Sequence, residues 1–239
     1  MIARAPLVTV TLRGLLGRRR LVLMLLLVLL PVLVAILVRV SGGRLDAAGI
    51  LDALMIRTVM PLVALVIGTT ALGSELEDGT AIFLLTKPIA RWRIVLAKLA
   101  VAGGLTVALV FPASLATGLI VSPAGAAGTA LGYASAAALG AVAYASVFLA
   151  LSAVTSRAIV VGLAYVLLWE GALAGLLEGT RFLSIRQGTL GVAAWLTGVH
   201  GSRVPLEIGT AASILAVAIV AGFAVATVRL AEYEVRAGD

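Results

Sequence analysis

The sequence predicts an all-α integral membrane protein. Of its 239 residues, 62% are hydrophobic and only 12% are charged, and the mean hydropathy is +1.18. One soluble core of this length could not bury so much apolar side chain. Uncharged runs recur at about 20 residues, the length that crosses roughly 30 Å of hydrocarbon. Because they are long and do not alternate, they predict helices rather than barrel strands.

Six such runs predict six transmembrane helices. They are 21–38, 58–74, 99–121, 129–154, 158–177 and 208–228. No internal repeat or linker divides the chain, so we expect a single domain over residues 1–239. The first run is longer than a usual signal-peptide core and no convincing cleavage pattern follows it, so we expect it to be retained.

The segment before the first run is basic and amphipathic. Val8, Leu12, Leu15 and Leu16 recur near helical spacing, and arginines occupy the remaining face. This pattern predicts an N-terminal interfacial helix that lies along the membrane surface. A frayed basic anchor is the alternative.

The distribution of cations predicts the orientation. Twelve of the 18 Lys and Arg residues fall in the N-terminal segment, the stretch 75–98, the turn 155–157 and the C-terminal tail, and six fall in the other loops. The positive-inside rule then places both termini and the 75–98 stretch in the cytoplasm, with the protein in the cell membrane. The net charge of +7 is explained by topology and by contact with anionic lipids, so no nucleic-acid partner is required.

The predicted outer loops differ in length. Residues 41–57 and 122–128 are short connections, and 178–207 is the longest loop. Within that loop, "GTLGVAAWLTGV" (188–199) is apolar but too short to span, so it predicts an interfacial or re-entrant helix. His200 is the only histidine and is interpreted as a plain loop residue.

The stretch 75–98, "ELEDGTAIFLLTKPIARWRIVLAK", concentrates charge between two apolar runs. Gly79 can take the left-handed conformation that ends a helix, and Thr80 can cap a new short one. The apolar side chains at 82–85 then need a cover on the cytoplasmic side. Pro88 suits the first turn of the following helix. The pattern predicts a helix-turn-helix protrusion that docks on a partner or packs on its own bundle.

The same stretch resembles the cytoplasmic loop between the second and third spans of ABC-2-type transporter permeases, the membrane subunits of ATP-driven exporters. The six spans, the cytoplasmic termini and the basic N-terminal helix also match that family and its type V exporter-like fold. The resemblance implies a coupling helix that docks on a nucleotide-binding ATPase subunit. The coupling residues that it implies are Glu75, Glu77, Asp78, Gly79, Thr80, Ile82, Phe83, Leu84, Leu85, Pro88, Arg91 and Lys98.

No phosphate-binding G-x-x-x-x-G-K-[ST] loop occurs in the sequence, so we expect no ATP hydrolysis and no catalytic residue in this chain. The resemblance implies ATP and Mg²⁺ in the ATPase subunit, and a second permease subunit that is either another copy or a related chain. With no cysteine and one histidine, no metal site is predicted.

Two other functions compete with this interpretation. An intramembrane lipid-modifying enzyme would need clustered carboxylates, and Glu75, Glu77 and Asp78 are clustered but lack the spaced metal-binding pattern. A stand-alone ion- or proton-coupled carrier would need several ionisable groups within the spans, where the sequence points only to Glu170. We expect Glu170 either to line a substrate path or to make a structural contact, with Arg39 or a polar cavity as its partner.

Overall fold

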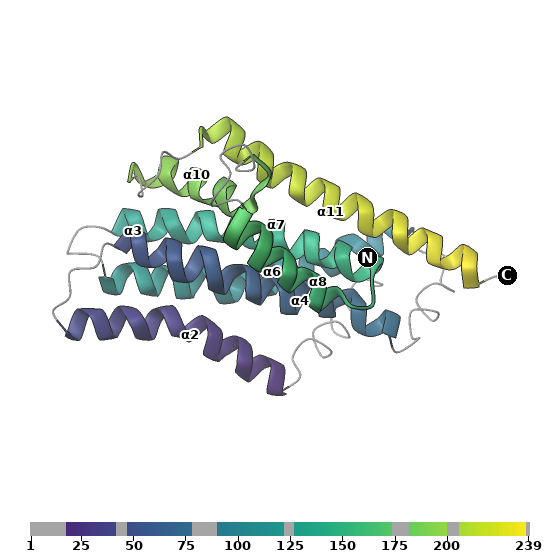
Figure 1. The fold of residues 1–239 in the computed structure, drawn as a ribbon, viewed down its shortest axis with the longest axis horizontal. Coiled ribbons are helices and arrows are strands. Elements are labelled where there is room, and N and C mark those ends of the chain that lie inside the picture. The colour runs from purple at the N-terminus through teal and green to yellow at the C-terminus, as the bar shows by residue number, and fades with distance from the viewer. Residues whose placement is uncertain are drawn as a thin grey trace, which may run out of the picture.

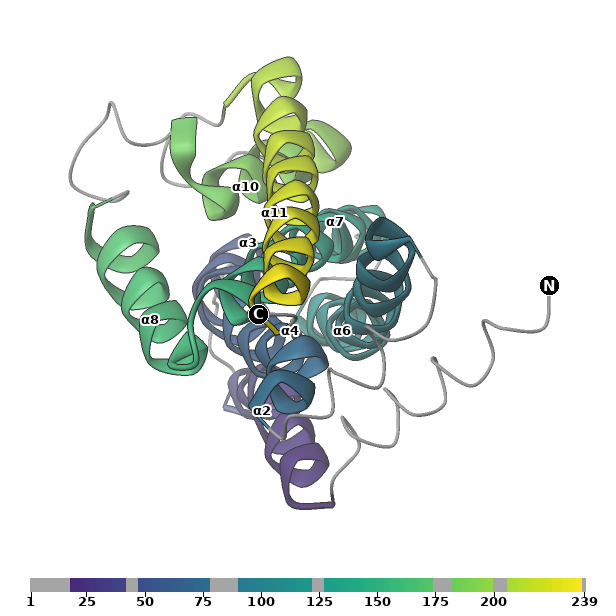
Figure 2. The ribbon, with the colours of Figure 1, turned by 90° about the vertical axis from the view of Figure 1, so that its right-hand side faces the viewer.

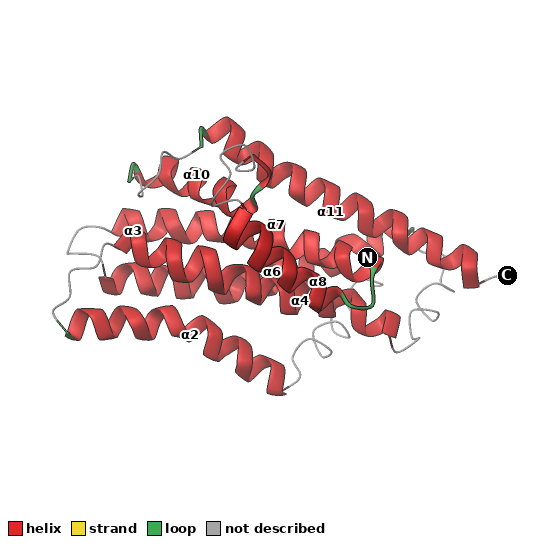
Figure 3. Ribbon diagram, viewed as in Figure 1, coloured by secondary structure: helices red, strands yellow, loops and turns green. Residues whose placement is uncertain are grey.

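The computed structural model describes residues 18–41, 47–77, 90–121, 127–173, 182–199 and 206–237. Within these ranges the protein is helical and contains no strand, as Figure 3 shows. The N-terminal interfacial helix predicted for residues 1–20 lies almost wholly outside the described residues.

Within the described residues, five helices are long and apolar enough to cross a membrane. Those spans lie in α2 (Arg18–Val40), α4 (Met60–Glu77) with the segments before it, α6 (Arg91–Val121), α7 (Ala127–Val154) and α11 (Ile208–Ala237). The exposed Trp92 lies in the first turn of α6, and the exposed Trp195 lies in the last turn of α10. Figure 1 places the start of α2 and the end of α11 toward the same end.

The second span is longer than predicted. A short helix α3 (Ala47–Ile50), a π-helical segment η1 (Leu51–Val59) and α4 follow one another without a break, so the helical rod runs from Ala47 to Glu77. The prediction that 41–57 forms a short loop is therefore wrong beyond Ala47. The buried face of η1, which includes Leu51, Met55 and Ile56, explains why this charged segment still packs inside the bundle.

The fifth predicted span, 158–177, is only partly described. Its residues form α8 (Ala158–Ala164) and a second π-helical segment, η2 (Tyr165–Leu173). The described apolar part is Ala158–Gly171, and residues 174–177 of the predicted span lie outside the described residues. Of the predicted segment 188–199, residues 188–197 are helical, within α10 (Ile185–Thr197).

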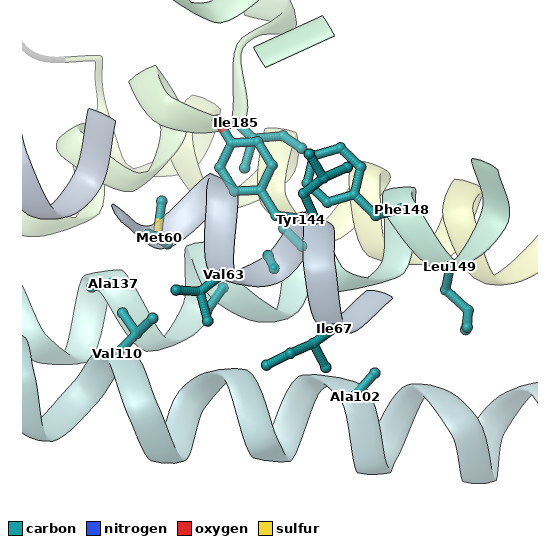
Figure 4. Packing of buried hydrophobic residues seen from close by; sticks show 14 of the residues in the cluster. Met60, Val63, Ile67, Ala102, Val110, Ala137, Tyr144, Phe148, Leu149 and Ile185 are labelled. Carbon is teal, nitrogen blue, oxygen red and sulfur yellow. The ribbon is translucent and has the colours of Figure 1, made fainter. Parts of the chain in front are cut away.

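α7 forms the centre of the bundle and packs against α4, α6, α10 and α11. Its buried side is rich in alanine and glycine, which lets neighbouring backbones approach closely. Gly68 of α4 shows this, because an added Cβ would collide with Phe148. Figure 4 shows the resulting core, with Tyr144 stacked on Phe148 and Met60, Val63 and Ile67 from the rod below them. α2 and α11 are peripheral and expose most of their apolar surface.

Candidate functional site

Three elements, η1, η2 and the start of α10, bring a group of polar side chains together; Glu170 and Ser184 are buried, whereas Arg57 is exposed. We call this group the polar cluster, and its members are Asp52, Arg57, Tyr165, Glu170, Ser184 and Arg186. Ionisable groups are costly within a membrane span and are placed there for a function or for a strong structural contact. The polar cluster is therefore the candidate functional site.

The start of α10 lies deep in the bundle. Thr197, at its last turn, packs on Gly132 near the start of α7, whereas Thr189 packs on Gly140. Gly140 is about 20 Å along the helix axis from the start of α7. α10 thus runs beside the amino-terminal half of α7, and its own first residues lie near the middle of that helix.

The carboxylate of Glu170, a residue of η2, lies at the amino end of α10. Its carboxylate is only 2% exposed and accepts hydrogen bonds from the Tyr165 hydroxyl (3.1 Å), the Ser184 hydroxyl (2.5 Å) and the Ile185 backbone N–H (2.9 Å). The partial positive charge at a helix amino end further stabilises the negative carboxylate. Arg39 is not its partner, because Arg39 donates to the Ile120 carbonyl oxygen at 2.5 Å. The expected pairing of Glu170 with Arg39 is wrong.

Local sequence explains why α10 begins where it does. Ser184 is extended (φ −100°, ψ 119°) and its hydroxyl accepts from the Gln187 backbone N–H at 3.1 Å, as an N-cap residue does. The order Ser-x-x-Gln matches a capping box. Gly198 ends the helix in the left-handed conformation (φ 67°), which glycine adopts without a Cβ penalty.

A second contact joins α10 to the rod. The Arg186 Nη2 atom lies 2.8 Å and 3.1 Å from the two carboxylate oxygens of Asp52. The Arg186 side chain is 11% exposed and that of Asp52 is 33% exposed. An arginine in the first turn of a helix is disfavoured by the helix dipole, so the Asp52 carboxylate compensates both the charge and its position.

The third contact joins the rod to η2. Arg57 Nη2 donates to the Gly171 carbonyl oxygen at 3.3 Å. Because η1 and η2 are π-helical, each has an irregular hydrogen-bond pattern, and such segments often mark functional sites. The polar cluster thus ties η1, η2 and α10 to one another through three separate contacts.

The predicted coupling residues are mostly outside the described structure. Glu75 and Glu77 belong to the last turns of α4, although their side chains are not described, and Arg91 is the first residue of α6. The predicted helix end near Gly79 lies outside the described residues. The coupling residues outside the described ranges are Asp78, Gly79, Thr80, Ile82, Phe83, Leu84, Leu85 and Pro88.

Lys98 is the coupling residue that the structure places most clearly. It is 3% exposed, and its Nζ atom donates to the Ala71 carbonyl oxygen at 2.7 Å. The bond joins α6 to α4, the two helices that the chain connects through residues 78–90. Lys98 therefore holds together the two helices that carry the predicted coupling stretch.

The sequence reasoning missed the ion pair between Asp52 and Arg186 and the capping role of Ser184. Two signals were available: the apolar pattern of Leu51, Met55 and Ile56 continues upstream of residue 58, and Ser184 precedes Gln187 at capping-box spacing. Among the residues that the structure describes, no group of three or more His, Cys, Asp or Glu side chains could hold a metal ion.

Comparison with known proteins assigns most of the chain. Residues 16–184 match the family described as ABC-2 family transporter protein. The matched region begins before α2 and ends at Ser184, so it includes both π-helical segments and the 75–98 stretch. No curated protein matches the chain.

Proposed function

Because the chain belongs to the ABC-2 family of transporter proteins, a family of ABC transporter permeases, we propose that it is the permease subunit of an exporter and works with a separate ATPase subunit. In this proposal the spans form the substrate pathway, and the 75–98 stretch docks on the ATPase. ATP and Mg²⁺ belong to the ATPase subunit. A second permease, either another copy of this chain or a related one, completes the transporter.

The continuous rod from Ala47 to Glu77 is the observation that carries the proposal. Its carboxyl end leads directly into the coupling stretch, and its other end contributes Asp52 and Arg57 to the polar cluster. A rod of this length extends roughly 45 Å. A movement imposed on the coupling stretch would therefore reach α10 and η2 through two defined contacts.

The orientation belongs to the same proposal. With the coupling stretch in the cytoplasm, both chain termini are cytoplasmic and α10 lies in the outer half of the cell membrane. One of the six cations predicted for the outer loops, Arg186, instead pairs with Asp52 at a partly buried position. Without it the excess of positive charge on the cytoplasmic side is larger, which supports the orientation. Cross-linking of the coupling stretch to a cytoplasmic ATPase tests it.

A stand-alone ion- or proton-coupled carrier is the second candidate. The sequence pointed to Glu170 alone, but Asp52 and Arg186 are also ionisable and lie in the helical segments. A carrier needs several ionisable groups within its spans, so these two further groups favour a carrier more than Glu170 alone does. However, Glu170 accepts three hydrogen bonds and the Asp52 carboxylate is paired with Arg186, so both carboxylates already have partners without a bound cation. The buried polar atom of the cluster that lacks a partner is Arg186 Nε, a donor, which would not bind a cation.

Purification of the tagged chain from its native membrane in mild detergent tests the proposal. We expect an ATPase subunit to co-migrate with the chain through size exclusion, and the complex to hydrolyse ATP while the chain alone does not. A carrier or a lipid-modifying enzyme would purify without an ATPase. A chain that runs alone and takes up an ion into vesicles along a gradient would contradict the proposal.

A further inference from the structure

A cavity of about 450 Å³ opens between α7, η2 and α11, beside the segment that leads into α10. We call it the α11 pocket. Val147 lines it from α7, Tyr165 from η2, Ile185 from α10, and Ile214 and Ala218 from α11. Its volume falls within the range of about 300–1,000 Å³ that is typical of small-molecule sites.

The bundle holds α11 in place on either side of the pocket. Toward the outer end, Gly191 of α10 packs against Ala211 with no room for a Cβ. Toward the other end, the Ser146 hydroxyl donates to the Ile219 carbonyl oxygen at 2.8 Å, and Gly222 packs on Ser146. Because α11 is anchored at both levels, the space between them is a built feature of the packing.

The mouth of the pocket faces the surroundings of the bundle. Phe182, Leu183 and Val217 line it and are each more than half exposed. In a bundle of membrane-spanning helices, exposed apolar side chains of this kind face hydrocarbon. Figure 2 shows α11 running past α10 and α7, the helices that share the pocket with it. The pocket is thus accessible from the lipid phase.

The chemistry of the lining selects against charge. Among the residues that the structure describes, no Asp, Glu, Lys or Arg lines the pocket. The Tyr165 hydroxyl donates to Glu170, and the Ser213 hydroxyl donates to the Thr210 carbonyl oxygen, so these two groups are already bonded. A charged group that entered would lose its hydration without a counter-charge. A hydrocarbon chain has no charge and no hydration shell, so it would not meet this desolvation cost.

We propose that the α11 pocket binds the hydrocarbon chain of an amphiphile taken from the bilayer, and that this amphiphile is the molecule the permease moves. The second part rests on the proposed function. A chain in the pocket would touch Tyr165 and Ile185, two of the three groups that donate to Glu170. The occupant therefore contacts the start of α10, which Asp52 links to the rod. A resident structural lipid would need no such connection.

Photo-cross-linking in nanodiscs tests the site. The probe is a phosphatidylcholine with a diazirine on one acyl chain, and labelled peptides are mapped by mass spectrometry. We expect labelling of residues 182–185 and 210–218, and loss of that labelling in Val217→Trp, where the indole blocks the mouth. Val220→Trp is the matched control, because Val220 is about as exposed on the same helix but does not line the pocket. Equal labelling of both variants and the wild type would overturn the proposal.

The same nanodiscs, loaded with the ATPase complex, separate a transported amphiphile from a resident lipid. We expect trapping with ATP and vanadate to change the labelling of the pocket. If the labelling of the pocket is the same with and without ATP and vanadate, the bound molecule is a resident lipid, and the substrate assignment is overturned. Normal ATP hydrolysis with no labelling of the pocket would refute this inference alone. Absence of any ATPase subunit would refute the proposed function, and the substrate assignment with it.

Discussion

Changing Phe83 and Leu84 to Asp should detach the ATPase subunit from the permease while the helical bundle still inserts and folds. If residues 82–85 fill a groove on the ATPase, each fully covered apolar side chain contributes roughly 1.5–3 kcal/mol. The introduced carboxylates would add unpaired buried charges. Since about 1.4 kcal/mol is a tenfold change in affinity, the affinity should fall by orders of magnitude.

Co-purification of the double variant beside the wild type measures this effect, and a thermal melt of the permease alone reports the stability of the bundle. The control is Phe83→Leu with Leu84→Met, which keeps the apolar surface and should keep the ATPase. If residues 82–85 instead pack on the chain's own bundle, the Asp variant would lose stability in detergent. If the Asp variant co-purifies with as much ATPase subunit as the wild type, residues 82–85 do not dock on the ATPase.

The second large effect is expected at the partly buried ion pair of Asp52 and Arg186. Asp52→Asn leaves the Arg186 guanidinium, which is 11% exposed, without its counter-charge in the first turn of α10. Breaking a buried pair from one side costs 3–5 kcal/mol, and the partial exposure of Asp52 places this case near the lower end, about 3 kcal/mol. Arg186→Met should cost less, because the remaining carboxylate is one-third exposed and can reach water.

The combined variant Asp52→Leu with Arg186→Met should recover most of the loss, since it removes both charges. The exposed pair of Arg229 and Glu232 provides the control in the same chain, and Arg229→Met should change stability by less than about 1 kcal/mol. Chemical unfolding in detergent gives the free energies. Equal losses for Asp52→Asn and Arg229→Met would mean that the buried pair does not hold α10.

The helical class and most spans were predictable, because bilayer thickness fixes the length of an apolar run. The start of the second span was not predictable, because Asp52 and Arg57 interrupt the apolar pattern and favour a loop. Their charges are compensated by Arg186 and by the Gly171 carbonyl oxygen, more than a hundred residues away. No local pattern reports a partner at that separation.

Glu170 was also predictable only in part. Its cost at membrane depth marked it from the sequence alone, but its partners were not predictable. Ser184 and Ile185 reach it only because the chain turns back into the bundle and starts α10 there. The family assignment came from the 75–98 stretch, and the match over residues 16–184 confirms it. The role of each residue in that stretch stays a prediction, because residues 78–89 lie outside the described structure.

A single cysteine at position 84 tests most directly whether this permease couples to a separate ATPase through the 75–98 stretch. The chain has no cysteine of its own, so Leu84→Cys places one thiol at the predicted contact. A short thiol-to-amine cross-linker, applied to native membranes, should join this residue to an ATPase subunit. Trp195→Cys is the control, because Trp195 is exposed and its neighbours Leu196 and Thr197 pack on Gly132 near the start of α7; it should give no such product. A cross-link from position 84 only to the chain itself, or to an ATPase only from position 195, would contradict the proposed coupling.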